Sequence, residues 1–252
     1  MKLSSMKLSS LTLAFAFVVL LPSPAQSQSL VGTYYSCSTA YEGEADALMN
    51  TVFADVYQSY VDKGQLTNWG WVEHTAGGPW RRITTITAED RSTVMATWRQ
   101  IDEQLEEEHP TALRRFNEIC DSHDDYIWTL ADSYEGTDPG GTAPTWLSVY
   151  FMCDPQNEAR ADELMAELST VTDKHVAAGH LSGWAWYKHD IGGRFRRLWT
   201  LLGAEGTDVI DALDMVTGEF EAEQTDTFAE FRSICSSHVD YIWADARTAG
   251  EG

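Results

Sequence analysis

Apolar residues recur at helical spacing early in the chain, and shorter apolar runs on either side of them predict strands. Leu48, Val52, Val56 and Tyr60 lie four positions apart, which predicts a helix over about residues 44–63. The other elements predicted in this part are strands at 33–38, 66–74, 80–87 and 125–129 and helices at 92–108 and around 113–119. The predicted order is therefore strand, helix, strand, strand, helix, strand.

The same order is predicted a second time, because two blocks of sequence recur 115 positions further along. The block 69–82 returns as 184–197, and the block 116–128 returns as 231–243. The second set of predicted elements is a strand at 147–153, a helix at 158–178, a hairpin turning at Gly192 and Gly193, helices at 208–223 and 227–235, and a closing strand at 240–243. We interpret the chain as one unit that was duplicated and fused.

The order β-α-β-β-α-β is that of the ferredoxin-like fold, in which both helices cover one face of the sheet. With this order present twice, the chain resembles the dimeric α/β-barrel superfamily, in which two such units put their bare sheet faces together. The resemblance implies an α+β protein of two tandem ferredoxin-like repeats that form a pseudo-dimeric α/β barrel within one chain. Members of this superfamily include cofactor-free monooxygenases, isomerases, haem enzymes and proteins without known chemistry, so the resemblance implies no single activity.

The first 27 residues have the composition of a secretory signal peptide. Lys2 and Lys7 precede an apolar run over 11–21, and small residues follow it. The run is too short to span a bilayer, so we expect export to the periplasm or the extracellular space with no membrane anchor after cleavage. The predicted boundaries are a signal peptide at 1–27, a first repeat at 28–131, a linker rich in Gly, Pro and Thr at 132–145, and a second repeat at 146–252.

The chain is strongly acidic, with a formal net charge of −22. Such a field repels nucleic acid and anionic lipid, so neither is expected as a partner. Solubility explains the charge without any partner, and a cationic partner remains the alternative. The number of chains in the functional particle stays open, since a fused pair could act as a monomer or assemble further.

The cysteines are distributed symmetrically between the repeats. Each repeat has one on its first predicted strand and one after its second helical region: Cys37 and Cys120, then Cys153 and Cys235. An even, symmetric set in an exported protein predicts one disulfide within each repeat. The alternative is a metal site, because His123 and His238 each follow a cysteine by three positions, but this spacing supplies only two ligands.

The histidines also form symmetric pairs. His74 and His189 end the second strand of each repeat, just before a Gly-Gly turn, and a histidine there is a candidate general acid or base. His123 and His238 follow the second helical region of each repeat, where a cation stabilises free helix carbonyls. For this second pair a role as ligand or base remains open.

Tryptophans and arginines gather on the predicted hairpins and form a candidate ligand site. Paired arginines beside aromatic rings can hold a carboxylate or a phosphate. Alternatively, the tryptophans fill the joint between repeats and the arginines pair with nearby Asp or Glu. The candidate residues are Trp69, Trp71, Arg81 and Arg82 in the first repeat and Trp184, Trp186, Arg196 and Arg197 in the second.

These patterns lead to one main hypothesis and two alternatives. The main hypothesis is an exported small-molecule-binding protein or cofactor-independent enzyme, with a pocket lined by the hairpin His, Arg and Trp residues. If the protein is an enzyme, the superfamily resemblance implies oxygenase or isomerase chemistry. The alternatives are a non-catalytic structural or interaction module and a haem- or metal-binding protein. No cofactor is assigned, and haem and metal remain open.

Overall fold

The computed structural model describes residues 28–136, 145–203 and 209–250. We call 28–136 the first half and the remainder the second half. The elements of the first half are β1 (Ser29–Ser36), α1 (Glu42–Leu48), a π-helical turn (Met49–Phe53), α2 (Ala54–Asp62), β2 (Asn68–Gly77), β3 (Arg82–Ala88), α3 (Arg91–Glu108), α4 (Pro110–Ile119) and β4 (Ser122–Glu135). Those of the second half are β5 (Thr145–Met152), α5 (Glu158–Ala177), β6 (Leu181–Ile191), β7 (Arg197–Gly203), α6 (Val209–Glu223), α7 (Thr225–Ile234) and β8 (Ser237–Thr248).

Local sequence explains where two of the helices begin. The side chain of Asp90 accepts a hydrogen bond from the Thr93 backbone N–H and caps α3. Pro110 occupies the first turn of α4, where its missing N–H leaves no helical hydrogen bond unmade. None of the helices in the described residues combines the length and apolar character needed to cross a bilayer.

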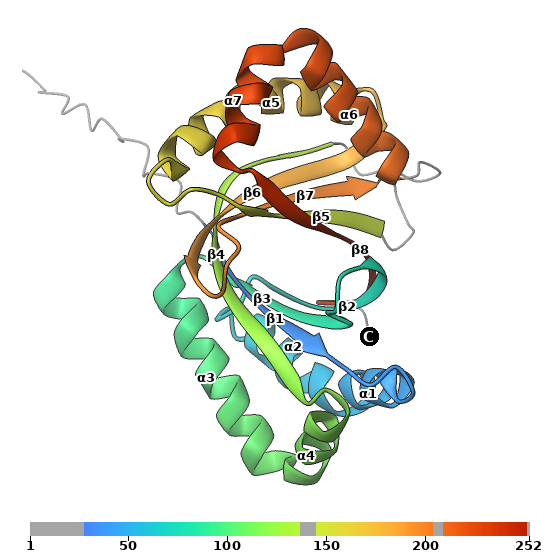
Figure 1. Cartoon of the computed structure of the whole chain (residues 1–252). Helices are drawn as coiled ribbons and strands as arrows, with labels where there is room; N and C mark the ends of the chain where they lie inside the picture. Colours follow the sequence, from blue (N-terminus) through green and yellow to red (C-terminus); the bar gives the residue numbers. More distant parts are fainter. Residues whose placement is uncertain (1–27, 137–144, 204–208, 251–252) are drawn as a thin grey trace, which may run out of the picture.

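The strands in the described residues close into one antiparallel barrel. Their order around it is β1-β3-β2-β8-β5-β7-β6-β4, and β4 pairs again with β1. Helices α1 to α4 lie outside the part of the barrel made by the first half, and α5 to α7 lie outside the part made by the second half (Figure 1). The protein therefore has an α+β architecture in which two helical layers enclose a barrel.

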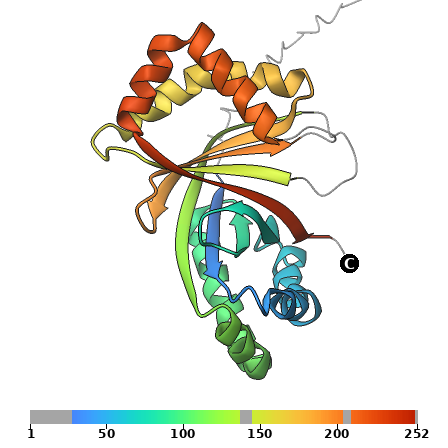
Figure 2. The ribbon, with the colours of Figure 1, turned by 45° about the vertical axis from the view of Figure 1, so that its right-hand side comes forward.

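The last strand of each half crosses to the other half and closes the barrel. β4 pairs with β6, and β8 pairs with β2 (Figure 2). The sequence patterns predicted much shorter closing strands, 125–129 and 240–243, and assigned 132–135 to the linker. That assignment was wrong for 132–135, because these largely polar residues form the end of β4 and pair with β6. The predicted signal peptide and residues 137–144 of the predicted linker lie outside the described residues.

Alternation along the strands separates an inner core from two outer cores. On β1, Val31 and Tyr35 face the helices of the first half, whereas Tyr34 faces the barrel interior. The inner core is mainly aromatic and consists of Tyr34, Val72, Trp80, Ile83, Tyr126, Trp128, Tyr150, Phe195, Leu198, Tyr241 and Trp243. Neighbouring rings stack, with centroids 5.1 Å apart for Tyr126 and Trp128 and 4.9 Å apart for Tyr241 and Trp243.

Each Gly-Gly turn packs against the crossing strand of the other half. Gly77 and Gly192 have φ values of 120° and 143°, a region that favours glycine. A side chain at Gly77 would collide with the backbone of β8 at Asp240 and Tyr241, and one at Gly192 would collide with Tyr126 of β4. The exact repetition of this turn in both halves is thus explained by the closure of the barrel.

Candidate functional site

The hairpin tryptophans pack between the sheet and the helices, and three of them, Trp69, Trp71 and Trp186, line none of the cavities described below. Trp71 Nε1 donates to Asp46 Oδ1 at 2.9 Å, and Trp186 Nε1 donates to Asp162 Oδ1 at 3.0 Å. Trp69 donates in the same way to Gln58 on α2. These rings are at most 2 % exposed and anchor each hairpin to the first helical region of its half.

Trp184 is held in the same manner, since its Nε1 donates to Asp173 on α5. It differs from the other three in also lining a cavity inside the barrel, described below.

The hairpin arginines are paired with carboxylates of the same helical regions. Arg82 binds Asp46 through Nε and Nη2, both at 2.7 Å, and Arg197 binds Asp162 at 2.7 and 2.9 Å. Both arginine residues are 3–4 % exposed. Each carboxylate therefore receives one arginine and one tryptophan, which explains why these residue types recur together.

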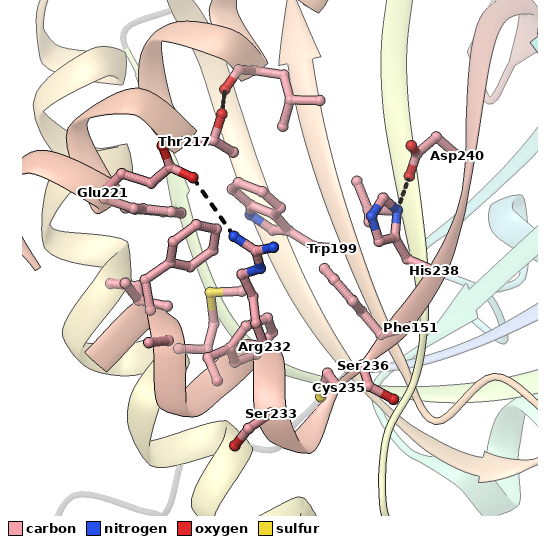
Figure 3. A pocket seen from close by; sticks show the side chains of 18 residues that line it. Phe151, Trp199, Thr217, Glu221, Arg232, Ser233, Cys235, Ser236, His238 and Asp240 are labelled. Atoms are coloured by element: carbon pink, nitrogen blue, oxygen red, sulfur yellow. Dashed lines mark hydrogen bonds and ion pairs between the residues drawn. The ribbon is translucent and has the colours of Figure 1, made fainter. Parts of the chain in front are cut away.

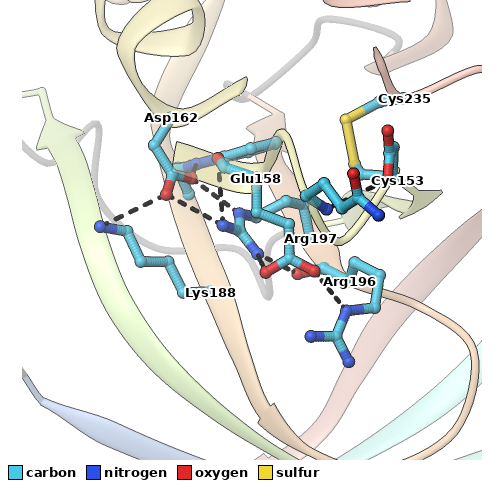
Figure 4. A network of polar contacts seen from close by, with 10 residues as sticks. Cys153, Glu158, Asp162, Lys188, Arg196, Arg197 and Cys235 are labelled. Atoms are coloured by element: carbon cyan, nitrogen blue, oxygen red, sulfur yellow. Dashed lines mark hydrogen bonds and ion pairs between the residues drawn. A yellow bond between two sulfur atoms is a disulfide. The ribbon is translucent and has the colours of Figure 1, made fainter. Parts of the chain in front are cut away.

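The other arginine of each pair, Arg81 or Arg196, binds a glutamate at the start of α1 or α5. Arg81 contacts Glu42 at 2.6 Å, and the hydrogen bond from Arg81 lowers the pKa of Glu42. Arg196 contacts Glu158 at 2.5 Å in the equivalent arrangement, seen beside Arg197 in Figure 4. The two arginine pairs are thus engaged within the protein.

His74 and His189 lie where the two halves join. His74 of β2 is the cross-strand partner of Trp243 of β8, and His189 of β6 is the partner of Trp128 of β4. Arg81 Nη1 donates to His74 Nδ1 at 2.7 Å, which requires an unprotonated Nδ1. Burial lowers the pKa of both imidazoles. A nearby positive charge lowers it further, that of Arg81 for His74 and that of Arg196 for His189. Neither is among the residues that line the three cavities described next.

The largest of these cavities, about 600 Å³, lies in the second half between the outer sheet face and helices α5 to α7, and we call it the C-terminal cavity. Its walls are largely apolar, formed by Val149, Phe151, Met165, Leu168, Leu213, Phe220, Phe228 and Phe231. Trp199 of β7 is 3 % exposed, and its Nε1 has no hydrogen-bond partner among the described residues. The cavity therefore combines an apolar interior with one buried, unused donor.

Polar side chains surround the opening of the C-terminal cavity (Figure 3). Arg232 of α7 and Glu221 of α6 form an exposed ion pair at 3.6 Å. On β8, His238 Nδ1 lies 2.8 Å from Asp240 Oδ1. With the proton on Nδ1 this contact is a hydrogen bond to the carboxylate, and Nε2 is then free to accept a proton.

A smaller cavity of about 260 Å³ occupies the equivalent place in the first half, under α3 and α4, and we call it the N-terminal cavity. Most of its lining residues correspond to those of the C-terminal cavity at a displacement of 115 or 116 positions, as Phe116 and His123 correspond to Phe231 and His238. The halves therefore carry related cavities with different linings.

A third cavity, of about 450 Å³, lies inside the barrel. Tyr34 and Tyr150, whose rings meet edge to face at 5.6 Å, line it together with hydroxyl residues such as Thr85, Ser148 and Thr200. Its lining combines polar and apolar residues, and fewer aromatic side chains contribute to it than to the inner core beside it.

Both predicted disulfides are present. Cys37 joins Cys120, and Cys153 joins Cys235, so the end of the first strand is tied to the end of α4 or α7 in its half. The alternative metal site from the Cys-x-x-His spacing was wrong, because a disulfide sulfur is not a thiolate ligand. Among the described residues, no group of three His, Cys, Asp or Glu side chains is placed to hold a metal ion.

Sequence reasoning missed the main features of the C-terminal cavity. It singled out His238, but it overlooked Trp199 and Arg232, because their counterparts in the first half, Thr84 and Asn117, are different residues. The signal that could have identified them was a difference between the repeats rather than an identity.

Comparison with known proteins identifies the fold class only. No protein-family model matches the sequence, and no curated protein matches it. Among solved structures, the chain is similar to a putative monooxygenase from Lactobacillus acidophilus, with 7 % identity, a TM-score of 0.57 and coverage of 90 % of this chain and 97 % of that one.

Two further similar structures have different names. One is an anthrone oxidase-like protein, with 13 % identity, a TM-score of 0.59 and coverage of 90 % of this chain and 94 % of that one. The other is a mutant chlorite dismutase from Candidatus Nitrospira defluvii, with 9 % identity, a TM-score of 0.56 and coverage of 89 % and 93 %. This protein thus resembles monooxygenase-like and chlorite dismutase-like α/β barrels.

Proposed function

We propose that this protein is an exported small-molecule-binding oxidoreductase whose ligand occupies the C-terminal cavity. We further propose that its halves are tandem ferredoxin-like units, so that the single chain corresponds to a dimer of the superfamily. The two disulfides support a location outside the reducing cytoplasm. The leader-like composition of 1–27 supports export.

The observation that carries the proposal is the unpartnered Nε1–H of Trp199. A buried N–H without an acceptor costs roughly 1–3 kcal/mol, so a site that retains one favours a ligand that supplies the acceptor. The apolar walls favour a molecule that is largely hydrophobic, and the volume of about 600 Å³ is within the usual range for small-molecule sites. A flat aromatic ketone or phenol has both properties.

The pair formed by His238 and Asp240 supports an oxidative reaction that needs no cofactor. In this reaction a CH₂ group beside an aromatic ketone loses a proton to His238 Nε2, and the carbanion passes one electron to O₂. The carbon radical and superoxide then combine, His238 returns its proton to give a hydroperoxide, and loss of water leaves a new ketone. CH₂ and O₂ become C=O and H₂O, with Asp240 holding the imidazole in the required tautomer.

Haem does not fit this cavity as well as an organic substrate does. Haem would need a ligand for its iron from the residues that line the cavity. Among the described residues that line the cavity His238 is the one histidine, and the proposed reaction uses its Nε2 as a base, so that nitrogen would not be available to an iron. No step of the proposed reaction passes through a haem.

Anthrone, which carries such a CH₂ group, is the first probe to test. We expect the purified protein to consume O₂ and form anthraquinone faster than buffer, with His238→Gln abolishing most of the gain. Trp199→Phe keeps an aromatic side chain but removes the indole N–H together with its five-membered ring, and we expect it to raise KM about tenfold in a variant that melts like the wild type. As a matched control, His123→Gln changes the corresponding histidine of the first half and should leave the rate unchanged.

Other outcomes would redirect the proposal. Saturable anthrone binding without turnover, weakened by Trp199→Phe, would leave a non-catalytic binding protein. A visible absorbance band in protein purified from the exported fraction would favour haem instead. Failure of anthrone and related phenols to bind at all would contradict the proposal.

A further inference from the structure

The N-terminal cavity has the lining of a site for an organic cation. Five aromatic side chains contribute to its walls: Tyr35, Phe53, Tyr57, Trp98 and Phe116. Phe116 is in edge-to-face contact with Tyr35, at a centroid distance of 5.2 Å, and with Phe53, at 5.6 Å. Aromatic walls that enclose a small space attract cations through the negative faces of the rings.

Two carboxylates of α3 line the same cavity without a counter-charge. Asp102 and Glu106 are one helical turn apart, and neither forms a hydrogen bond or an ion pair with any described residue. Asp102 remains exposed, but partial loss of its hydration and the nearby charges of Asp125, Glu106 and Glu103 raise its pKa to about 6, while His123 acts in the opposite direction. Among the described residues that line the cavity there is no Lys or Arg, and His123 is the one side chain that can carry a positive charge.

The corresponding positions in the second half show how the cavities differ in charge. Glu106 corresponds to Glu221, which pairs with Arg232, whereas Arg232 is replaced by Asn117 in the first half. Asp102 corresponds to the uncharged Thr217. The first half has thus gained one carboxylate and lacks the guanidinium, a difference of two charges at the same place in the fold.

We propose that the N-terminal cavity binds a small organic cation, of the quaternary-ammonium or protonated-amine class, between the aromatic walls and the carboxylates of Asp102 and Glu106. The cavity volume of about 260 Å³ suits a compact molecule such as choline. Because the site shares no residue with the C-terminal cavity, it is independent of the oxidative function proposed above.

Calorimetric titration with choline at pH 7.5 and low salt tests the proposal directly. We expect saturable binding of one choline with a dissociation constant below about 1 mM. The neutral control ligand is 3,3-dimethyl-1-butanol, which has the shape of choline without its charge and should bind at least tenfold more weakly. Equal binding of the two molecules, or no choline binding, would overturn the proposal.

Variants distinguish the site from general attraction to an acidic surface. Asp102→Asn and Glu106→Gln should each weaken choline binding about fivefold to twentyfold, and Asn117→Arg should weaken it further by supplying an internal cation. Glu107→Gln removes a charge one residue away that does not line the cavity, and it should have less than a twofold effect. Equal effects of Glu106→Gln and Glu107→Gln would overturn the proposal.

Acidity and the second cavity provide two further checks. Choline binding should weaken between pH 7.5 and pH 5 as Asp102 is protonated. Besides buried tyrosines, the other titratable groups near Asp102 are Glu103, Glu106, His123 and Asp125. Trp199→Phe should leave choline binding unchanged, so the two proposals can fail separately. Loss of choline binding in Trp199→Phe, in a variant that melts like the wild type, would contradict a site in the first half.

Discussion

The N-terminal and C-terminal cavities occupy the same place in the two halves, yet their linings favour different ligands. Both have a phenylalanine wall and a histidine beside an aspartate, at 3.2 Å for His123 and 2.8 Å for His238. They differ at Asp102 against Thr217, at Asn117 against Arg232, and in volume. The comparison shows that the two halves share a framework, by which we mean the disulfide and the paired hairpin tryptophans and arginines of each half, and that the linings of their cavities differ.

The largest expected effect tests whether the framework is equally important in both halves. Replacing Cys37 and Cys120 with Ser, or Cys153 and Cys235 with Ser, should each lower the free energy of unfolding by about 4 kcal/mol, because each disulfide closes a loop of more than eighty residues. Urea denaturation measures both variants. A loss below about 1 kcal/mol in one half only would show that the framework is not shared equally.

Removing the buried arginine of each hairpin should be almost as costly. Arg82→Met and Arg197→Met leave Asp46 or Asp162 without its bidentate partner, and we expect a loss of about 3 kcal/mol from either change. The exposed Arg99 provides a control, since Arg99→Met should change stability by less than about 0.5 kcal/mol. If Arg82→Met or Arg197→Met weakened ligand binding strongly without changing stability, the hairpin arginines would have a binding role instead.

These framework residues could be predicted from the sequence because they are identical in both repeats. The order of elements followed from periodicity, and the disulfides followed from the symmetric cysteines. Identity between the repeats did not distinguish a binding role from a packing role. Trp71 and Arg82 recur because they share Asp46, which only the structure reveals.

Other features had no visible signal in the sequence. Asp132 to Glu135 are polar because they lie on an exposed part of β4, so their composition resembled that of a linker. The cavities depend on which strand face the helices cover and on side chains contributed by separate elements. Trp199 and Asp102 became meaningful only when the two cavities could be compared.

The carboxylate of Asp102 in the N-terminal cavity should lower the free energy of unfolding at neutral pH. A carboxyl whose pKa is raised by folding stabilises the fold only while protonated, and this contribution is lost as pH rises from about 4 through about 6. Asp102→Asn should therefore stabilise the protein at pH 7.5 by about 1 kcal/mol, after allowance for solvent screening at an exposed position, and much less at pH 4. Urea denaturation at both pH values checks this, with Glu107→Gln as the exposed control.

An NMR spectrum of the tryptophan indole N–H groups tests the central claim most directly, because Trp98 lines the N-terminal cavity and Trp199 lines the C-terminal cavity. With ¹⁵N-labelled protein and assignments from Trp98→Phe and Trp199→Phe, choline should shift the Trp98 resonance and leave that of Trp199 in place. Anthraquinone, the product of the proposed reaction, should do the reverse. Two ligands that shift the same indole, or neither indole, would contradict the account of two related cavities with separate specificities.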